Sequence, residues 1–328
     1  MLKPLLRNAS IFLPQRRFAS GNAFQRGNPL PITITPSKDE VDRLQLSSQN
    51  LETAIGSLHK DGLVVIEDVV DHGSLDALNE VMTRDAYVLR DKPDSPFNYN
   101  PGNIQQDPPP ILEHFHRSIF LNPVTSQVTS TFLGPRPKWT FCSGNTAMPP
   151  TPESPPQSQP VHTDADFAHP AHPFALVINV PLITMTPNNG STEVWLGTQN
   201  NADLDAQDGR HGERASGRIK SHLLEERRAT RPPSQPFVKK GSIVIRDLHL
   251  WHAGKGNHTP DPRVMLAMIH FAPWYRNPMR LEFAEEIRTV IEGQSGLEVP
   301  VDWISREKAL SSYLNRGFGN SYDFNQTP

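Results

Sequence analysis

The stretch 241-GSIVIRDLHLWH-252 shows the pattern that decides the fold. It starts at a glycine, continues as a short run rich in β-branched residues, and reaches His252 where the strand pattern ends. Similar short segments, separated by turn signals, occur near residues 137–148, 173–184, 192–197 and 263–274. The pattern predicts a mainly β protein with flanking helices, built on a sandwich or a jelly roll, the double-stranded β-helix.

The segments around this β region predict helices and loops. Residues 51–62 form an amphipathic pattern that ends at a glycine, and residues 63–70 read as a short strand. A second helix is expected to follow, with Ser74 as its N-cap. Loops are expected over 91–110 and 149–160, and a mostly helical extension over 280–328. The 33 prolines among 328 residues argue against a helical bundle.

Charge is distributed unevenly along the chain. Residues 1–38 hold six basic and no acidic side chains, which leaves 26 basic and 35 acidic groups, a net charge of −9, in the remainder. Such a body is a poor partner for nucleic acid. The basic leader resembles a mitochondrial transit peptide, with 16-RRFAS-20 resembling a cleavage region, and the alternative is a basic tail that stays. The expected location is therefore mitochondrial or cytoplasmic.

Two counts exclude further classes. The single cysteine, Cys142, rules out an internal disulfide framework and a cysteine-rich zinc site, and it is expected to be a buried small hydrophobic residue. No run approaches 18 apolar residues, so no membrane span is predicted.

The segment 160-PVHTDADF-167 carries the first candidate metal ligands. His162 and Asp164 are two residues apart, so on an extended chain both side chains leave the same face. An imidazole and a carboxylate placed in this way can chelate a divalent metal. Asp166 shares that face and is the alternative carboxylate.

A third ligand must come from another segment, and His252 is the best candidate. Two histidines and one carboxylate form the facial triad of non-haem Fe(II) oxygenases, which leaves positions open for oxygen and a co-substrate. Four other histidines are expected on the surface or in loops: His169, His172, His249 and His258.

Arg263 begins the apolar segment 263-RVMLAMIHF-271, eleven residues after His252. A guanidinium that enters such a strand is costly unless it meets an anion, ideally a carboxylate in bidentate geometry. The alternative is a surface arginine at a strand end.

Together these segments resemble the phytanoyl-CoA dioxygenase family of Fe(II)- and 2-oxoglutarate-dependent oxygenases, and its fungal-type members in particular. The matching segments occur in the family's order and cover about residues 50–275. They are 58-LHKDGLVVIEDVVD-71, the His162–Asp164 pair, 188-NNGSTEVWLGTQN-200 and 236-PFVKKGSIVIRDLHLWHAGKGNHTPDPR-263. The resemblance implies one domain over 39–328, with a variable insertion at 209–233.

The resemblance also implies roles for individual residues. His162, Asp164 and His252 would bind Fe(II), and Arg263 would hold the C5 carboxylate of 2-oxoglutarate. Ascorbate is an expected reductant that would keep the iron ferrous.

Weaker co-substrate contacts are implied at Gln106, with its neighbour Gln105 as the alternative, and at Thr192. Two positions depart from the family pattern. The family histidine after a glycine is replaced by Gln199, and Gly254 stands where some members offer a serine to the co-substrate.

The function implied is oxidation of a C–H bond of a small organic substrate by O2, with release of succinate and CO2, in secondary metabolism. The alternatives are an acyl-CoA 2-hydroxylase of lipid metabolism, and a cupin-like metalloprotein or silent binding protein that does not use 2-oxoglutarate. The chain is expected to be a monomer or a homodimer.

Two further features remain open at this point. Trp139 and Phe141 either line the pocket or belong to the core. The basic insertion either recruits an anionic substrate or is an ordinary solvated helix and loop.

Overall fold

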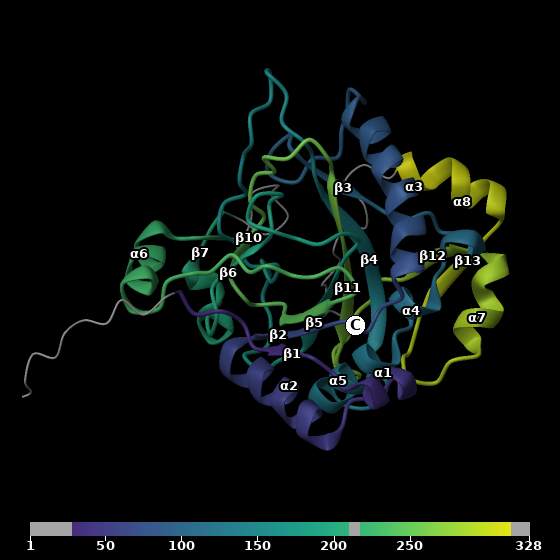
Figure 1. The fold of residues 1–328 in the computed structure, drawn as a ribbon, viewed down its shortest axis with the longest axis horizontal. Helices are drawn as coiled ribbons and strands as arrows, with labels where there is room; N and C mark the ends of the chain where they lie inside the picture. Colours follow the sequence, from purple (N-terminus) through teal and green to yellow (C-terminus); the bar gives the residue numbers. More distant parts are fainter. Residues whose placement is uncertain (1–27, 210–216, 316–328) are drawn as a thin grey trace, which may run out of the picture.

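A seven-stranded sheet dominates the computed structural model, which describes residues 28–209 and 217–315 (Figure 1). Every neighbouring pair in it is antiparallel except β1–β2. In spatial order the strands are β1 (Thr33–Ile34), β2 (Leu63–Ile66), β9 (Ile243–Asp247), β5 (Ala175–Pro181), β11 (Arg263–Phe271), β4 (Lys138–Ala147) and β3 (Asn103–Gln106).

Shorter strands form a second, smaller β layer. It contains the pairs β6 (Glu193–Val194) with β10 (His252–Ala253) and β7 (Gln207–Asp208) with β8 (Arg218–Ile219). Isolated bridges from His162 to His252 and to Arg218 join these pairs. One cavity is lined from both layers, so they face each other across it, as the layers of a jelly roll do. The mainly β fold with flanking helices is confirmed.

The helices are α1 (Lys38–Arg43), α2 (Ser48–Asp61), α3 (His72–Arg90), α4 (Arg117–Phe120), α5 (Pro123–Leu133), α6 (Ser221–Thr230), α7 (Arg288–Glu292) and α8 (Arg306–Ser312). Most of them lie along the outer side of the large sheet, whereas α6 lies beside the smaller β layer (Figure 1). α2 packs on β2 and α5, and α3 packs on β3 and β11. Short 3₁₀ turns lie at Leu112–His114, Gln199–Asn201, Leu204–Ala206, Glu285–Ile287 and Tyr313–Asn315. None of the helices in the described ranges is both long and apolar enough to cross a membrane.

The N-cap of α3 differs from the sequence prediction. Asp71 is the cap, because its carboxylate accepts the N–H of Ser74 at 2.7 Å. Ser74 is therefore inside the first turn. The helix therefore begins three residues earlier than predicted, because the Asp71 carboxylate caps the N–H of Ser74 itself.

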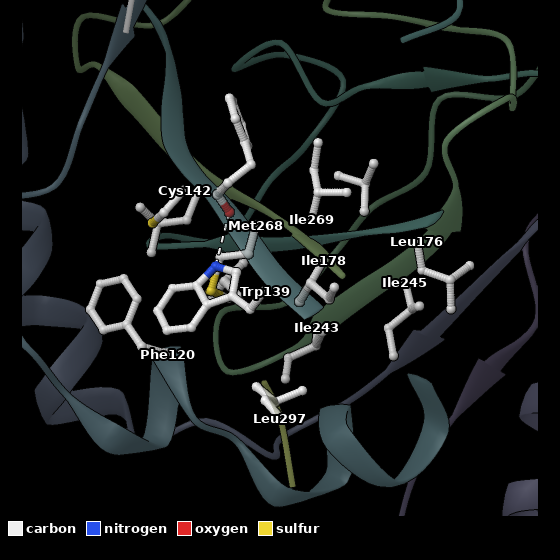
Figure 2. Packing of buried hydrophobic residues seen from close by; sticks show 14 of the residues in the cluster. Phe120, Trp139, Cys142, Leu176, Ile178, Ile243, Ile245, Met268, Ile269 and Leu297 are labelled. Atoms are coloured by element: carbon white, nitrogen blue, oxygen red, sulfur yellow. Dashed lines mark hydrogen bonds between the residues drawn. The ribbon is translucent and has the colours of Figure 1, made fainter. Parts of the chain in front are cut away.

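The main core lies between the large sheet and its helices. Trp139 is fully buried there, stacks on Phe120 of α4 with centroids 6.2 Å apart, and donates its indole N–H to the Phe141 carbonyl at 2.9 Å (Figure 2). The register of β4 against β11 shifts between Phe141 and Trp139. The shift puts the two side chains on opposite faces. Trp139 therefore belongs to the core, and Phe141 lines the cavity.

Three segments differ from their predicted structure. The C-terminal region is not mostly helical in its described part, because β12 (Leu281–Ala284) and β13 (Val301–Ile304) form a parallel pair that buries alternate apolar side chains. The predicted loop over 91–110 contains β3, an edge strand of the sheet. The sheet also takes in Thr33–Ile34, inside the span assigned to the leader.

Most of the basic leader, residues 1–27, lies outside the described residues, as do residues 210–216 of the insertion. The described part of the insertion holds β8 and α6. Three of its arginines are engaged within the fold. Arg227 donates to the Leu196 carbonyl, Arg228 lies over the Trp195 ring, and Arg231 pairs with Asp61 at 2.7 Å. These contacts favour a packed helix over a substrate-recruiting surface.

Candidate metal centre

Two histidines from distant segments meet across the smaller β layer. The N–H of His162 donates to the carbonyl of His252, and the N–H of His252 donates to the carbonyl of His162, both at 2.9 Å. The two imidazole rings lie on the same side, with centroids 4.3 Å apart. This antiparallel pairing holds both rings at one edge of the cavity.

The ring orientation fixes which nitrogen each histidine offers. Nδ1 of His162 lies 2.9 Å from the Pro160 carbonyl, and Nδ1 of His252 lies 2.9 Å from the Leu250 carbonyl. A carbonyl oxygen only accepts, so both Nδ1 atoms carry the proton and both Nε2 atoms keep a lone pair. A histidine held in this way is prepared for metal binding through Nε2.

Asp164 completes the candidate site. Its Oδ1 lies 3.8 Å from Nε2 of His162 and 3.7 Å from Nε2 of His252. One ligand atom from each of the three residues lies within 4.8 Å of the other two. Two imidazoles and a carboxylate that converge in this way fit a divalent first-row metal. Asp166, the alternative carboxylate, is not part of this group.

The electrostatics of the site favour the metal-binding forms. Burial lowers the pKa of His162 and of His252, and the nearby Arg246 guanidinium adds to the effect. Burial acts to raise the pKa of Asp164, but Arg246 and the two histidines outweigh it, and the pKa lies well below its usual range. Neutral imidazoles and an ionised carboxylate are the forms that bind a metal.

A cavity between the two β layers opens beside the triad, and most of the residues that line it carry polar side chains. Side-chain amides come from five positions: Asn98, Gln105, Asn145, Gln159 and Asn179. The apolar side chains of the lining are Phe141, Met265 and Ala267. Thr192, predicted as a co-substrate contact, also lies in the lining.

The two neighbouring glutamines of β3 point in opposite directions. Gln105 lines the cavity, whereas Gln106 is buried on the other face and donates to the Met82 carbonyl at 3.0 Å. Of the two glutamines, Gln105 is therefore the one that the fold places at the cavity, and the preferred Gln106 is not. The physical reason is the period of a strand, which sends successive side chains to opposite faces.

Arg263 is buried beside the cavity. Its guanidinium donates to the Gly190 carbonyl at 2.7 Å and to the Asn145 carbonyl at 3.3 Å. Its Nε is buried with no hydrogen-bond partner among the residues described, and burial lowers its pKa to about 10. Both carbonyl partners lie at the cavity's edge: Asn145 lines the cavity itself, and Gly190 is two residues before Thr192, which also lines it. The cation thus lies next to the cavity and meets only carbonyls in the described part of the chain.

Sequence reasoning missed Arg246 of β9. This arginine is 5% exposed, lines the cavity and donates to Asp164 Oδ2 at 2.5 Å. The signal was present in 241-GSIVIRDL-248, because an arginine inside a β-branched run needs an anion for the reason already given for Arg263. Asn179, an amide inside the apolar run of β5, is the second missed residue and accepts from Arg246 Nε at 3.1 Å.

Gln159 explains one departure from the family pattern. Its Oε1 accepts the N–H of Gly254 at 2.8 Å, and a Cβ on Gly254 would lie 2.6 Å from the same oxygen. A serine at this position would require the Gln159 side chain to shift, at the expense of the hydrogen bond that its Oε1 accepts here.

One of the spare histidines is not a surface group. His249 is buried, its Nδ1 lies 2.6 Å from Asp247 Oδ1, and its Nε2 lies 3.0 Å from His169 Nδ1. It therefore belongs to a polar network behind the loop that carries His252.

A jelly-roll-like pair of β layers with a His–Asp–His site at the edge of its cavity defines a non-haem iron enzyme of the oxygenase type. The sequence pattern of the phytanoyl-CoA dioxygenase (PhyH) family matches residues 58–265, more than half of the chain. The chain belongs to this family. It is an Fe(II)- and 2-oxoglutarate-dependent oxygenase, with iron as cofactor and 2-oxoglutarate as co-substrate.

Solved structures share the fold. The non-heme alpha ketoglutarate dependent epimerase SnoN from nogalamycin biosynthesis is 14% identical, with a TM-score of 0.50 over 69% of this chain and 82% of that one. The structure of SnoN in complex with Fe3+, alpha ketoglutarate and nogalamycin RO is 14% identical, with a TM-score of 0.51 over 69% of this chain and 84% of that one.

Proposed function

We propose that this enzyme oxidises a C–H bond of a small polar molecule and releases succinate and CO2 from 2-oxoglutarate. The observation that carries the proposal is the His162–Asp164–His252 triad at the edge of a cavity whose lining includes five side-chain amides. Bound iron, with 2-oxoglutarate and O2, would supply the oxidising power. The protein's own groups bind and orient the two organic molecules.

Different residues are proposed to bind the metal and the co-substrate. The triad would hold the metal, with the two Nε2 atoms and Asp164 Oδ1 as the atoms available to it. Arg263 is the proposed partner of the far carboxylate of 2-oxoglutarate, because it is a buried cation whose Nε has no hydrogen-bond partner among the described residues. Gln105 and Thr192, both in the lining, are the proposed neutral contacts.

The lining favours a polar substrate over a long acyl chain. Side-chain amides donate and accept hydrogen bonds, and would be left unpaired against a hydrocarbon. The cavity's apolar side chains are few, and the arginine in its lining donates to Asp164 through Nη2. These features support a substrate with hydroxyl or amide groups, as in secondary metabolism, over an acyl-CoA thioester.

The test is the release of labelled CO2 from 1-¹⁴C-2-oxoglutarate by the Fe(II)-loaded protein. A panel of polyols, amino acids and aminated sugars is compared with acyl-CoA thioesters. Turnover stimulated by a polar compound, with matching succinate and an oxidised product, is the expected result. Stimulation by acyl-CoA alone would support the lipid-metabolism alternative. Failure to bind 2-oxoglutarate with metal loaded would support the cupin-like or silent alternative.

A further inference from the structure

Arg246 binds only one of the two oxygens of the Asp164 carboxylate. Oδ1 faces both imidazole Nε2 atoms, at 3.8 and 3.7 Å, whereas Oδ2 receives the Arg246 Nη2 hydrogen bond at 2.5 Å. One oxygen is therefore directed toward the metal position and the other is already occupied by a cation.

The guanidinium is itself held in place. Arg246 lies on β9 near the centre of the sheet, and its Nε donates to Oδ1 of Asn179 on the neighbouring strand β5 at 3.1 Å. Both side chains are about 5% exposed. A planar guanidinium fixed at Nε has little freedom to turn its Nη2 away from the carboxylate.

The number of oxygens that Asp164 gives to the metal decides how many positions stay open. A carboxylate binds a cation through one or both oxygens. A facial triad with a one-oxygen carboxylate leaves three octahedral positions, of which 2-oxoglutarate takes two. A second Asp164 oxygen would take the position that O2 needs.

We propose that Arg246 is a positioning residue that restricts Asp164 to a single metal-binding oxygen and so keeps one coordination position open for O2. This inference rests on the proposed function, because it requires the triad to bind the metal. The simpler role for Arg246 is a counter-ion that only stabilises the buried carboxylate, and the experiment must separate the two.

The experiment counts metal-bound waters in the Mn(II)-loaded protein through its water-proton relaxation. Arg246→Met removes the donors at similar length. We expect the inner-sphere relaxation to fall by about one third, with Mn(II) bound at least as tightly as before. Addition of 2-oxoglutarate should then leave about one exchangeable water in the parent protein and none in the variant.

Two further variants complete the design. Asn179→Ala removes only the Nε anchor and should give an intermediate relaxation, and it decides the matter if Arg246→Met does not fold. Lys240→Gln is the matched control, because it removes a cation that pairs with Asp76 at 2.5 Å, outside the cavity lining. Its relaxation should equal that of the parent.

The outcomes are distinct. Unchanged relaxation in folded Arg246→Met, or in Asn179→Ala where the former does not fold, would overturn the inference and leave Arg246 as a counter-ion. Absence of Mn(II) binding by the parent protein would instead overturn the proposed function.

Discussion

His162 and His252 hydrogen-bond to each other through both of their backbone N–H groups, at 2.9 Å each. This pairing brings together two imidazole rings that are distant in the sequence, with their centroids 4.3 Å apart. It also means that the candidate metal site joins the segment before β5 to β10, the short strand after β9. The site is therefore as stable as the pairing of these two segments, and metal binding stabilises that pairing in return.

Replacement of His252 by alanine should remove a metal ligand without breaking the backbone pairing. Loss of one of three ligands should lower Mn(II) affinity by more than about 100-fold. Isothermal titration with Mn(II) measures the effect. His258→Ala, outside the triad, is the control and should bind as the parent does. Retention of parental affinity by the His252 variant would remove it from the triad.

Replacement of Arg263 by alanine should weaken the binding of 2-oxoglutarate and leave metal binding unchanged. The lost charge-assisted hydrogen bonds are worth about 2–5 kcal/mol, so the affinity should fall by at least about 30-fold. Titration of the Mn(II)-loaded protein with 2-oxoglutarate measures it. Arg280→Ala, which breaks an exposed pair with Asp302, is the control. If the Arg263 variant keeps normal co-substrate affinity, the C5 carboxylate binds elsewhere.

Gln105 and Gln106 form a matched pair. Gln105→Ala should lower co-substrate affinity about fivefold to tenfold and leave stability nearly unchanged, because it removes one hydrogen bond in the cavity. Gln106→Ala should leave affinity unchanged and cost about 1–3 kcal/mol in the free energy of unfolding, because the Met82 carbonyl loses its buried partner. Urea unfolding and 2-oxoglutarate titration check both. The reverse pattern would restore Gln106 as the co-substrate contact.

The stability of the metal-free protein should fall as the pH drops below about 6.5. Burial lowers the pKa of His162 and of His252, and it lowers that of His270, which faces Thr129 in the core, to about 3. Below about pH 6.5 the unfolded chain binds protons at these histidines, whereas the folded chain does not. The free energy of unfolding is therefore highest above that pH and declines below it.

The slope should approach about 1.4 kcal/mol per pH unit for each such histidine. Urea unfolding at several values between pH 7.5 and 5 measures it. His270→Gln should reduce the slope by the contribution of one histidine. A free energy of unfolding that does not change over this pH range would contradict the prediction.

The sequence alone predicted the fold class and the three candidate metal ligands. The short β-branched segments between turn signals are typical of strands, and H-x-D on an extended chain places two candidate ligands on one face. His252 and Arg263 could be selected as candidate site residues because each lies at an end of an apolar strand. A polar or charged side chain is costly there unless it binds a partner.

The tertiary structure decided what local patterns leave open. Which face of β3 meets the cavity depends on pairing with β4, and this selects Gln105 over Gln106. A register shift sends Trp139 to the core, an outcome that the alternation of β4 does not predict. The contact of Arg246 with Asp164 joins strand β9 to a loop that is distant from it in the sequence. Residue spacing fixes the direction of a side chain along its own strand, and only packing between strands fixes what that side chain meets.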